Sequence, residues 1–248
     1  MRINRWFFIA FILVLAGAMV MQGIEIRDLK LANRSGVEVE KTVCLSKLAN
    51  VRLSTVIVCS SSGKGTGTII KQDKEFIYVL TARHCVIKKK RLLVLIYDSD
   101  GTKITKKVKK HNIIMDRNND LAVVKLEKAE GEEVTTVELA VAKPKWGDKI
   151  YSMGHPAGQH FFLAKGIVSN YERMDVEHTN MLMMIANIST FPGNSGGGVY
   201  NEEFEFIGVS VRVGIHNIKR NKKLIIQTMS YIMPLETIHK FLKEKGVM

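Results

Sequence analysis

Most of the chain alternates short runs rich in β-branched and aromatic residues with short polar or glycine-containing segments. Runs of this length and composition predict antiparallel β-structure rather than helix. The polar stretch Asp98–Gly101, between two of the runs, has the composition of a hairpin turn. A first set of predicted strands comprises Val51–Cys59, Thr66–Lys71, Phe76–Thr81, Arg91–Tyr97, Lys103–Lys109, Asn112–Met115 and Leu121–Leu126, and a second set comprises Asp148–Met153, Lys165–Ser169, Met181–Asn187, Val199–Tyr200, Glu205–Val211 and Leu224–Ser230.

The spacing of apolar residues changes near the C-terminus. Pro234 is followed by the segment Leu235–Gly246, whose apolar positions at helical intervals are Leu235, Ile238, Phe241 and Leu242. Such spacing predicts a helix with one apolar face. Apart from this helix, the pattern after residue 48 predicts strands and turns.

The first 22 residues differ from the rest. Arg2 and Arg5 precede an uncharged apolar run, residues 6–21, which is intermediate in length between a signal-peptide core and a membrane span. Arginines before such a run favour a cytoplasmic N-terminus and place the remainder outside. We therefore expect residues 1–22 to be a signal peptide or membrane-anchor helix, residues 23–47 to be a spacer, and the protein to be extracytoplasmic: secreted, periplasmic, or anchored facing outward. Residues 6–21 could then contact a membrane; the alternative is a buried core helix.

The composition is typical of a globular protein and is strongly basic. Hydrophobic residues make up 46% and charged residues 25% of the 248 positions, and the formal net charge is +13. The lysine-rich runs Lys88–Arg91 and Lys106–Lys110 could bind nucleic acid or anionic lipid. They flank predicted strands, however, where lysines discourage edge-to-edge pairing. No helix-turn-helix, zinc-finger or RNA-binding aromatic motif accompanies them, so we expect no nucleic-acid partner.

One stretch, Phe191–Gly198, places a serine among four glycines behind a proline. Glycines allow positive φ and close approach of other atoms, so a serine hydroxyl can point outward while neighbouring N–H groups converge beside it, as an oxyanion hole requires. Alone, the stretch is equally consistent with a tight turn or a linker. Two upstream stretches favour the catalytic interpretation: Leu80–Cys85, which contains His84, and Asn119–Leu126, which contains Asp120.

Taken in chain order, the three stretches resemble the trypsin-like serine proteases, most closely the bacterial HtrA type. The resemblance covers about residues 48–240. It implies an all-β fold of two packed six-stranded antiparallel β-barrels with a C-terminal α-helix. The N-terminal barrel would occupy residues 48–136, and the second barrel with the helix would occupy residues 137–248. Only two residues follow the predicted helix, so we expect none of the PDZ modules that many HtrA-type enzymes carry.

The resemblance also implies a role for each residue of the trio. Ser195 would be the nucleophile, His84 the base that takes its proton, and Asp120 the carboxylate that orients the imidazole. The backbone N–H groups of Gly193 and Ser195 would form the oxyanion hole. Alone, the histidine could equally be a surface or core residue and the aspartate a turn residue.

By the same resemblance, four residues would contact substrate: Thr190, Phe191, Ser210 and Val211. Ser210 would also hydrogen-bond Asp120. In the family, the pocket for the P1 side chain is built from the segment before the nucleophilic serine and from a later strand, here around residues 189–191 and 208–212. Neither segment has an acidic residue that could lie at the pocket base, so we expect a small or medium apolar P1 residue. Arg212 could narrow the pocket or bind a carboxylate, but we interpret it as a solvent-facing strand residue.

The remaining candidate chemistry is limited. Cys85 follows His84, where animal trypsins have a bridged cysteine, and Cys59 could be its partner in an oxidising compartment; free thiols are the alternative, and Cys44 is unpaired in either case. His155, in Gly-His-Pro, replaces a tyrosine frequent in the family and is expected to be structural. No histidine pair has metal-ligand spacing with a glutamate partner. We therefore expect neither a metal nor another cofactor.

The sequence supports two classes of function. The first is an exported serine endopeptidase that acts on proteins or peptides. The alternative is a non-catalytic trypsin-fold binding module whose basic surface engages acidic partners or phospholipid head groups. Such modules usually lose a residue of the trio, whereas all three residues are present here, which favours the enzyme.

Overall fold

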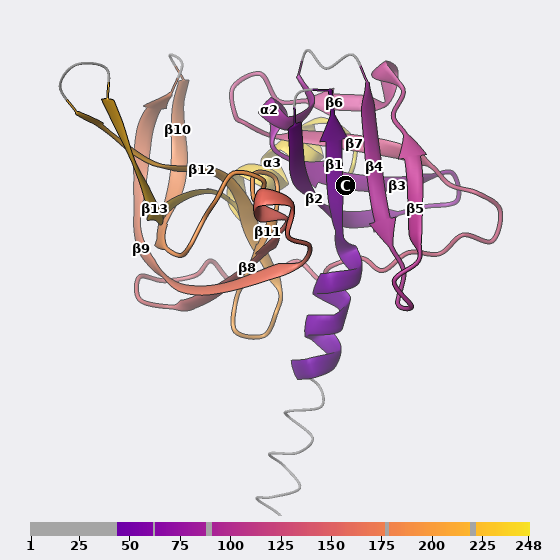
Figure 1. Cartoon of the computed structure of the whole chain (residues 1–248), viewed down its shortest axis with the longest axis horizontal. Helices are drawn as coiled ribbons and strands as arrows, with labels where there is room; N and C mark the ends of the chain where they lie inside the picture. Colours follow the sequence, from indigo (N-terminus) through magenta and orange to yellow (C-terminus); the bar gives the residue numbers. More distant parts are fainter. Residues whose placement is uncertain (1–43, 62, 88–90, 177–178, 219–221) are drawn as a thin grey trace, which may run out of the picture. The chain divides into compact units, whose positions relative to one another are not determined.

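The computed structural model describes residues 44–61, 63–87, 91–176, 179–218 and 222–248 (Figure 1). The chain divides into two units, residues 1–46 and 47–248, and both sheets and the candidate site lie in the second. The predicted signal peptide or anchor and most of the predicted spacer lie outside the described residues. Within the described ranges, no helix has the length and apolar character needed to span a membrane.

The first half of the second unit is a seven-stranded antiparallel sheet curled around its own apolar core (Figure 1). Its order is β5-β4-β1-β2-β3-β7-β6. The core consists of inward-facing aliphatic residues such as Val56, Ile69, Ile77 and Val124, each at most 1% exposed. The strands are β1 (Thr55–Ser60), β2 (Gly63–Gln72), β3 (Phe76–Thr81), β4 (Leu92–Tyr97), β5 (Lys103–Lys107), β6 (Ile113–Met115) and β7 (Ala122–Glu127).

The second half is a closed antiparallel barrel in the order β10-β13-β12-β11-β8-β9. Its interior is filled by large side chains, among them Tyr200, Phe206, Met183 and Met184. The strands are β8 (Lys149–Gly154), β9 (Phe162–Val176), β10 (Thr179–Asn187), β11 (Gly198–Tyr200), β12 (Phe206–Ile218) and β13 (Lys222–Pro234). Of the short helical turns, α2 (Arg83–Val86) and η1 (Lys110–Asn112) belong to the first half, and η2 (Pro156–Gly158) belongs to the second.

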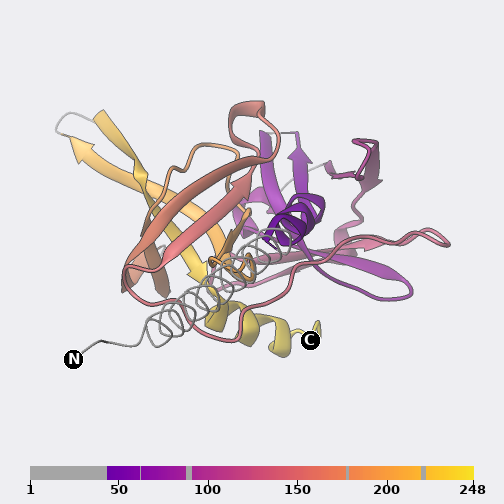
Figure 2. The same cartoon turned by 90° about the horizontal axis from the view of Figure 1, so that it is seen from below.

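Helix α3 (Leu235–Glu244) follows β13 directly and closes one side of the unit; it lies at the back in Figure 1 and at the lower edge of the unit in Figure 2. Ile238, Phe241 and Leu242 are at most 1% exposed and join the core of the second barrel. Just beyond the helix, the carbonyl of Val247 accepts a hydrogen bond at 2.6 Å from the amine of Lys71 on β2. The C-terminal segment therefore contacts both halves.

The predicted fold of two packed β units with a C-terminal helix is confirmed, with two differences in the first half. It has seven strands rather than six, and its hydrogen-bond ladder does not join β5 to β6. Strand β6 has only three residues, and β5 alternates exposed and half-buried positions, with lysines at both ends. A short strand and a lysine-bearing edge leave the ladder open there.

The predicted strand Val51–Cys59 is wrong at its start, because residues 44–54 are helical and β1 begins at Thr55. The Ser54 hydroxyl donates to the Asn50 carbonyl at 2.8 Å, and the Thr55 hydroxyl donates to the Val51 carbonyl at 2.7 Å. Side chains that cap the last carbonyls of a helix stabilise its end. The β-branched composition of Val51–Cys59 conceals this boundary.

We predict that Phe241→Ala lowers the free energy of unfolding by about 3–5 kcal/mol, because the ring is 1% exposed and its removal leaves a cavity under α3. The measurement is urea unfolding of the full chain. His239→Ala, on the exposed face of the same helix, is the control and should change stability by less than about 0.5 kcal/mol. Equal effects of both substitutions would contradict the described packing of α3.

Candidate active site

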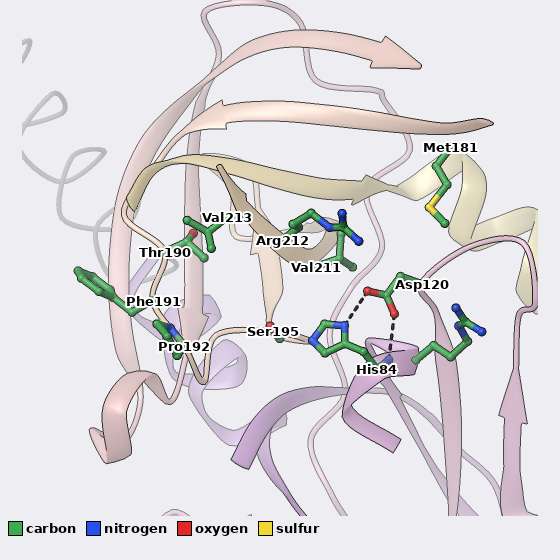
Figure 3. Close-up of a pocket in the computed structure, with 11 residues that line it drawn as sticks. His84, Asp120, Met181, Thr190, Phe191, Pro192, Ser195, Val211, Arg212 and Val213 are labelled. Atoms are coloured by element: carbon green, nitrogen blue, oxygen red, sulfur yellow. Dashed lines mark hydrogen bonds and ion pairs between the residues drawn. The ribbon is translucent and has the colours of Figure 1, made fainter. Parts of the chain in front are cut away.

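The three predicted catalytic residues line one cavity of about 380 Å³ (Figure 3). His84 and Asp120 come from segments that adjoin strands β3 and β7 of the first sheet, and Ser195 comes from the loop before β11. The wall of the cavity also includes the apolar residues Met181, Phe191, Pro192, Val211 and Val213, together with Thr190, Arg83 and Arg212. Residues far apart in sequence thus converge on one concave surface between the two halves.

The pairing of β3 with β7 brings His84 and Asp120 together. In this antiparallel pair Thr81 lies opposite Ala122. His84 follows β3 on the short helix α2, and Asp120 comes two residues before β7, so both lie at the same end of the pair. A further hydrogen bond at 3.2 Å, from the Arg83 N–H to the Asp120 carbonyl, continues the contact beyond the strands.

The Asp120 carboxylate contacts His84 twice. Its Oδ2 lies 2.6 Å from the imidazole Nδ1, and its Oδ1 accepts the backbone N–H of His84 at 2.9 Å (Figure 3). Two contacts to one carboxylate fix both the position and the rotation of the ring. The other ring nitrogen is directed toward Ser195 in Figure 3.

This pair shifts both pKa values away from their ordinary ranges. Burial of the imidazole disfavours its charged form, but the hydrogen bond with Asp120 and the neighbouring Cys85 sulfur outweigh burial and raise the pKa of His84 to about 10. Burial likewise opposes ionisation of Asp120, but hydrogen bonding to His84 and the charges of His84 and Arg83 hold the pKa of this carboxyl below its ordinary value. The carboxylate is therefore a stable partner for an imidazolium.

The loop that carries Ser195 is held from both sides. On the side of the second barrel, the Gly196 N–H donates to the Ser210 carbonyl at 2.7 Å, and the Ser210 N–H donates to the Gly197 carbonyl at 2.9 Å. On the side of the first sheet, the Thr66 N–H donates to the Ser195 carbonyl at 2.8 Å. Among the described residues, no hydrogen bond joins the Ser195 hydroxyl to His84. Such a contact is often long or poorly aligned until a substrate binds.

Gly193 has a backbone conformation that residues other than glycine rarely adopt. Its φ is +106°, and a Cβ at this position would lie 2.4 Å from the carbonyl oxygen of His155. Its own carbonyl accepts the Thr66 hydroxyl at 2.6 Å. Within the part of the chain that the structure describes, the N–H groups of Gly193 and Ser195 donate no hydrogen bond, so both remain available to an oxygen atom bound beside Ser195.

His155 has the structural character expected from the sequence. It is 2% exposed, and its N–H donates to the Thr66 hydroxyl oxygen at 3.1 Å. Its Nδ1 accepts the Phe161 N–H at 3.3 Å. Burial, with the nearby charges of His160 and Lys64, lowers the pKa of His155 to about 3. The ring is therefore neutral at physiological pH and supports the loop beside Gly193.

The predicted substrate-contacting residues divide into two groups. Thr190, Phe191 and Val211 line the cavity, whereas Ser210 does not. The expected hydrogen bond from Ser210 to Asp120 is wrong, because the Ser210 hydroxyl is buried and has no partner among the described residues. Ser210 contributes instead through its backbone, which holds the loop of Ser195.

Several lining residues are not among the predicted contacts. Met181 and Val213 lie on strands that the sequence predicts, but nothing in a β-pattern indicates which residues face a neighbouring loop. Arg212 is exposed, as the sequence predicts, yet its side chain also forms part of the cavity wall (Figure 3). In the described ranges, no three or more His, Cys, Asp or Glu side chains are grouped so that they could hold a metal ion.

All three cysteines are free, so Cys59 and Cys85 are not bridged. The Cys85 sulfur lies 3.5 Å from the carbonyl oxygen of Ser195. Gly65 lies beside both groups: a Cβ added there would lie 2.6 Å from the Cys85 sulfur, 3.1 Å from the Ser195 carbonyl oxygen and 3.4 Å from the Cys85 Cβ. Gly65, rather than Cys59, thus occupies the position from which a cysteine could reach Cys85.

Comparison with known proteins agrees with this architecture. The family described as "Trypsin-like peptidase domain" matches residues 65–209. The "Serine protease HtrA-like" proteins of Staphylococcus aureus strains MRSA252 and USA300 are 29% identical to this chain over 194 residues, covering 73% of this chain and 23% of theirs. The chain therefore spans less than a quarter of the length of these relatives.

Two solved structures share the fold. The structure of Rv3671c from M. tuberculosis H37Rv in an inactive form superposes with a TM-score of 0.62 at 16% identity, covering 81% of this chain and 90% of that one. The structure of Deg5 gives a TM-score of 0.62 at 21% identity, covering 81% and 92%. At these identities the comparison concerns the fold alone.

We predict that Gly65→Cys forms a disulfide with Cys85, because a Cβ added at Gly65 lies 3.4 Å from the Cys85 Cβ, close to the separation of about 3.5–4.5 Å found in disulfides. The closed loop should stabilise the oxidised protein by about 3 kcal/mol. The measurement is a free-thiol titration of the denatured, unreduced variant together with thermal unfolding. Gly65→Ser is the size-matched control. Recovery of all four thiols of the oxidised variant would contradict the described geometry.

Proposed function

Because the chain belongs to the trypsin-like peptidase domain family, we propose that it is a serine endopeptidase that uses Ser195, His84 and Asp120. The observation that carries this proposal is the double contact of Asp120 with His84, which leaves the second ring nitrogen directed toward Ser195. An imidazole held in this way can act as a base only on the side of the serine.

In the first half of the proposed reaction, the Ser195 oxygen attacks the carbonyl carbon of the substrate, and its proton moves to His84. The resulting oxyanion accepts hydrogen bonds from the free N–H groups of Gly193 and Ser195. Each such donor stabilises the transition state by about 2.7–4 kcal/mol. The carbon–nitrogen bond then breaks, and His84 gives its proton to the leaving amine. The product is an ester between Ser195 and the acyl part of the substrate.

In the second half, water attacks this ester and its proton moves to His84. The bond to Ser195 breaks, the serine oxygen recovers the proton from His84, and the carboxylic acid leaves. Throughout both halves, Asp120 holds the ring orientation and stabilises the imidazolium without becoming protonated, which agrees with its lowered pKa. The proposed substrate is a protein or peptide, and no cofactor is required.

The proposal includes export. It rests on the two arginines before the apolar run of residues 6–21, which favour transfer of the remainder across a membrane. The proposed organisation remains a leader or anchor over residues 1–22, a spacer over 23–47, and barrels over 48–136 and 137–248. N-terminal sequencing of the exported form distinguishes a cleaved leader from a retained anchor.

We predict that wild-type protein reacts covalently with a fluorophosphonate probe, whose fluoride is displaced by the Ser195 oxygen, and cleaves an unfolded protein. Ser195→Ala should abolish labelling and lower kcat by about 10⁶-fold. Ser99→Ala, in the exposed β4–β5 hairpin, is the control. Absence of wild-type labelling would instead support the non-catalytic binding module with a basic surface.

We predict that kcat/KM rises with pH, with a midpoint above 6.5 and up to about 10, because only the neutral imidazole accepts the serine proton and Asp120 raises the pKa of His84. Asp120→Asn should move this midpoint down toward 6.5 and lower kcat by about 10⁴-fold. The measurement is the pH profile of a peptide substrate. Asp175→Asn, which removes an exposed carboxylate on β9, should leave the profile unchanged. A wild-type midpoint below 6.5 would refute the role given to Asp120.

A further inference from the structure

The charges on the cavity wall are unevenly balanced. Asp120 is the only carboxylate among the described lining residues, and it is engaged with His84. Two arginines, Arg83 and Arg212, line the same cavity. Arg83 already acts on Asp120, since its charge helps to lower the pKa of that carboxyl. The second arginine therefore brings a positive charge that the wall itself does not neutralise.

Arg212 is placed to meet a ligand. It lies on β12 between two lining residues, Val211 and Val213, and pairs across the sheet with Tyr231. Its side chain is exposed, and within the described residues it makes no ion pair, hydrogen bond or ring contact. Figure 3 shows the guanidinium on the same side of the cavity as the His84–Asp120 pair. It is therefore accessible from the space in which a substrate would lie.

The rest of the wall suits an aliphatic stem. Val211 is 4% exposed and Met181 is 3% exposed, and both line the cavity, so this part of its wall is apolar and closely packed. The Thr190 hydroxyl is occupied by a 2.8 Å hydrogen bond to the buried Ser230 hydroxyl. Methylene groups fit against this surface, whereas a charged group is stabilised only near the arginines.

We propose that Arg212 determines specificity by binding a carboxylate side chain of the substrate, glutamate above aspartate, on the acyl side of the bond that Ser195 attacks. A glutamate stem would lie on the apolar wall and its carboxylate would pair with the guanidinium. This assignment rests on the proposed peptidase function. It departs from the sequence-based interpretation of Arg212 as a solvent-facing residue, under which the substrate contacts are purely apolar.

The chemistry of arginine supports this choice. A guanidinium presents paired donors that match a carboxylate and is less strongly hydrated than a lysine amine. In a partly enclosed cavity such a pair is screened less than on an open surface. The net charge of +13 also attracts acidic substrates as they approach. Lysine or arginine in the same substrate position would face repulsion from Arg212.

The test is a set of fluorogenic peptides that differ only in carrying Glu, Asp, Gln, Leu or Lys at each position from P1 to P4. The measured quantity is the ratio of kcat/KM for the Glu peptide to that for its Gln counterpart. We expect a ratio of roughly 10–100 at one position for the wild type, as one charge-assisted pair predicts. The ratio should fall as NaCl is raised from low to high concentration.

Arg212→Gln should bring the ratio close to one, and Arg212→Glu should reverse it so that the Lys peptide becomes preferred over the Glu peptide. Arg212→Lys should retain only part of the preference, because the paired donors are lost. Arg91→Glu is the matched control: it makes the same change of charge at an exposed position before β4 that does not line the cavity. Its ratio should equal that of the wild type.

The outcomes separate the two proposals. If the fluorophosphonate probe does not label the wild type, the peptidase function fails. If the wild type is labelled and cleaves peptides but shows no preference for Glu over Gln at any of the four positions, the role of Arg212 is overturned while the peptidase function stands. A Glu preference that survives in Arg212→Glu would also overturn it.

Discussion

The candidate site depends on one residue that ties the second barrel to the first sheet, Thr66 on β2. Its N–H donates to the Ser195 carbonyl, its hydroxyl donates to the Gly193 carbonyl, and its hydroxyl oxygen accepts the His155 N–H. Its own carbonyl accepts the Thr81 hydroxyl at 2.6 Å. A single strand position thus fixes the serine loop relative to β3, the strand that leads to His84. Three groups from two halves can meet only if this junction is rigid.

The junction also explains where glycine is required. A Cβ on Gly196 would lie 2.1 Å from the Thr66 carbonyl oxygen and 2.2 Å from the Thr81 hydroxyl. The loop of Ser195 therefore approaches the first sheet more closely than any side chain allows. Gly193 meets the His155 carbonyl in the same way from the other side. The glycine-rich motif is thus a consequence of backbone packing on both faces of the loop.

Much of this arrangement follows from the sequence, because strand pattern and motif order are local properties. The convergence of His84 with Asp120 needs only the antiparallel pairing of the strands beside them. Other features depend on tertiary contacts. Helical residues before Thr55 are held by side-chain caps, the buried Ser210 hydroxyl lacks the partner that the resemblance implied, and the position of Arg212 in the wall depends on how β12 meets the opposite half. A sequence pattern specifies which face of a strand a residue occupies, but not what lies across from that face.

The division of the site between two halves has a consequence for the assembly of the protein. A chain in which only the first sheet has folded carries the imidazole and the carboxylate but lacks a nucleophile. A second barrel on its own has the serine without a base. Under the proposed mechanism, a partly folded chain is therefore inert toward its surroundings, and the capacity to cut arises only when the two halves dock.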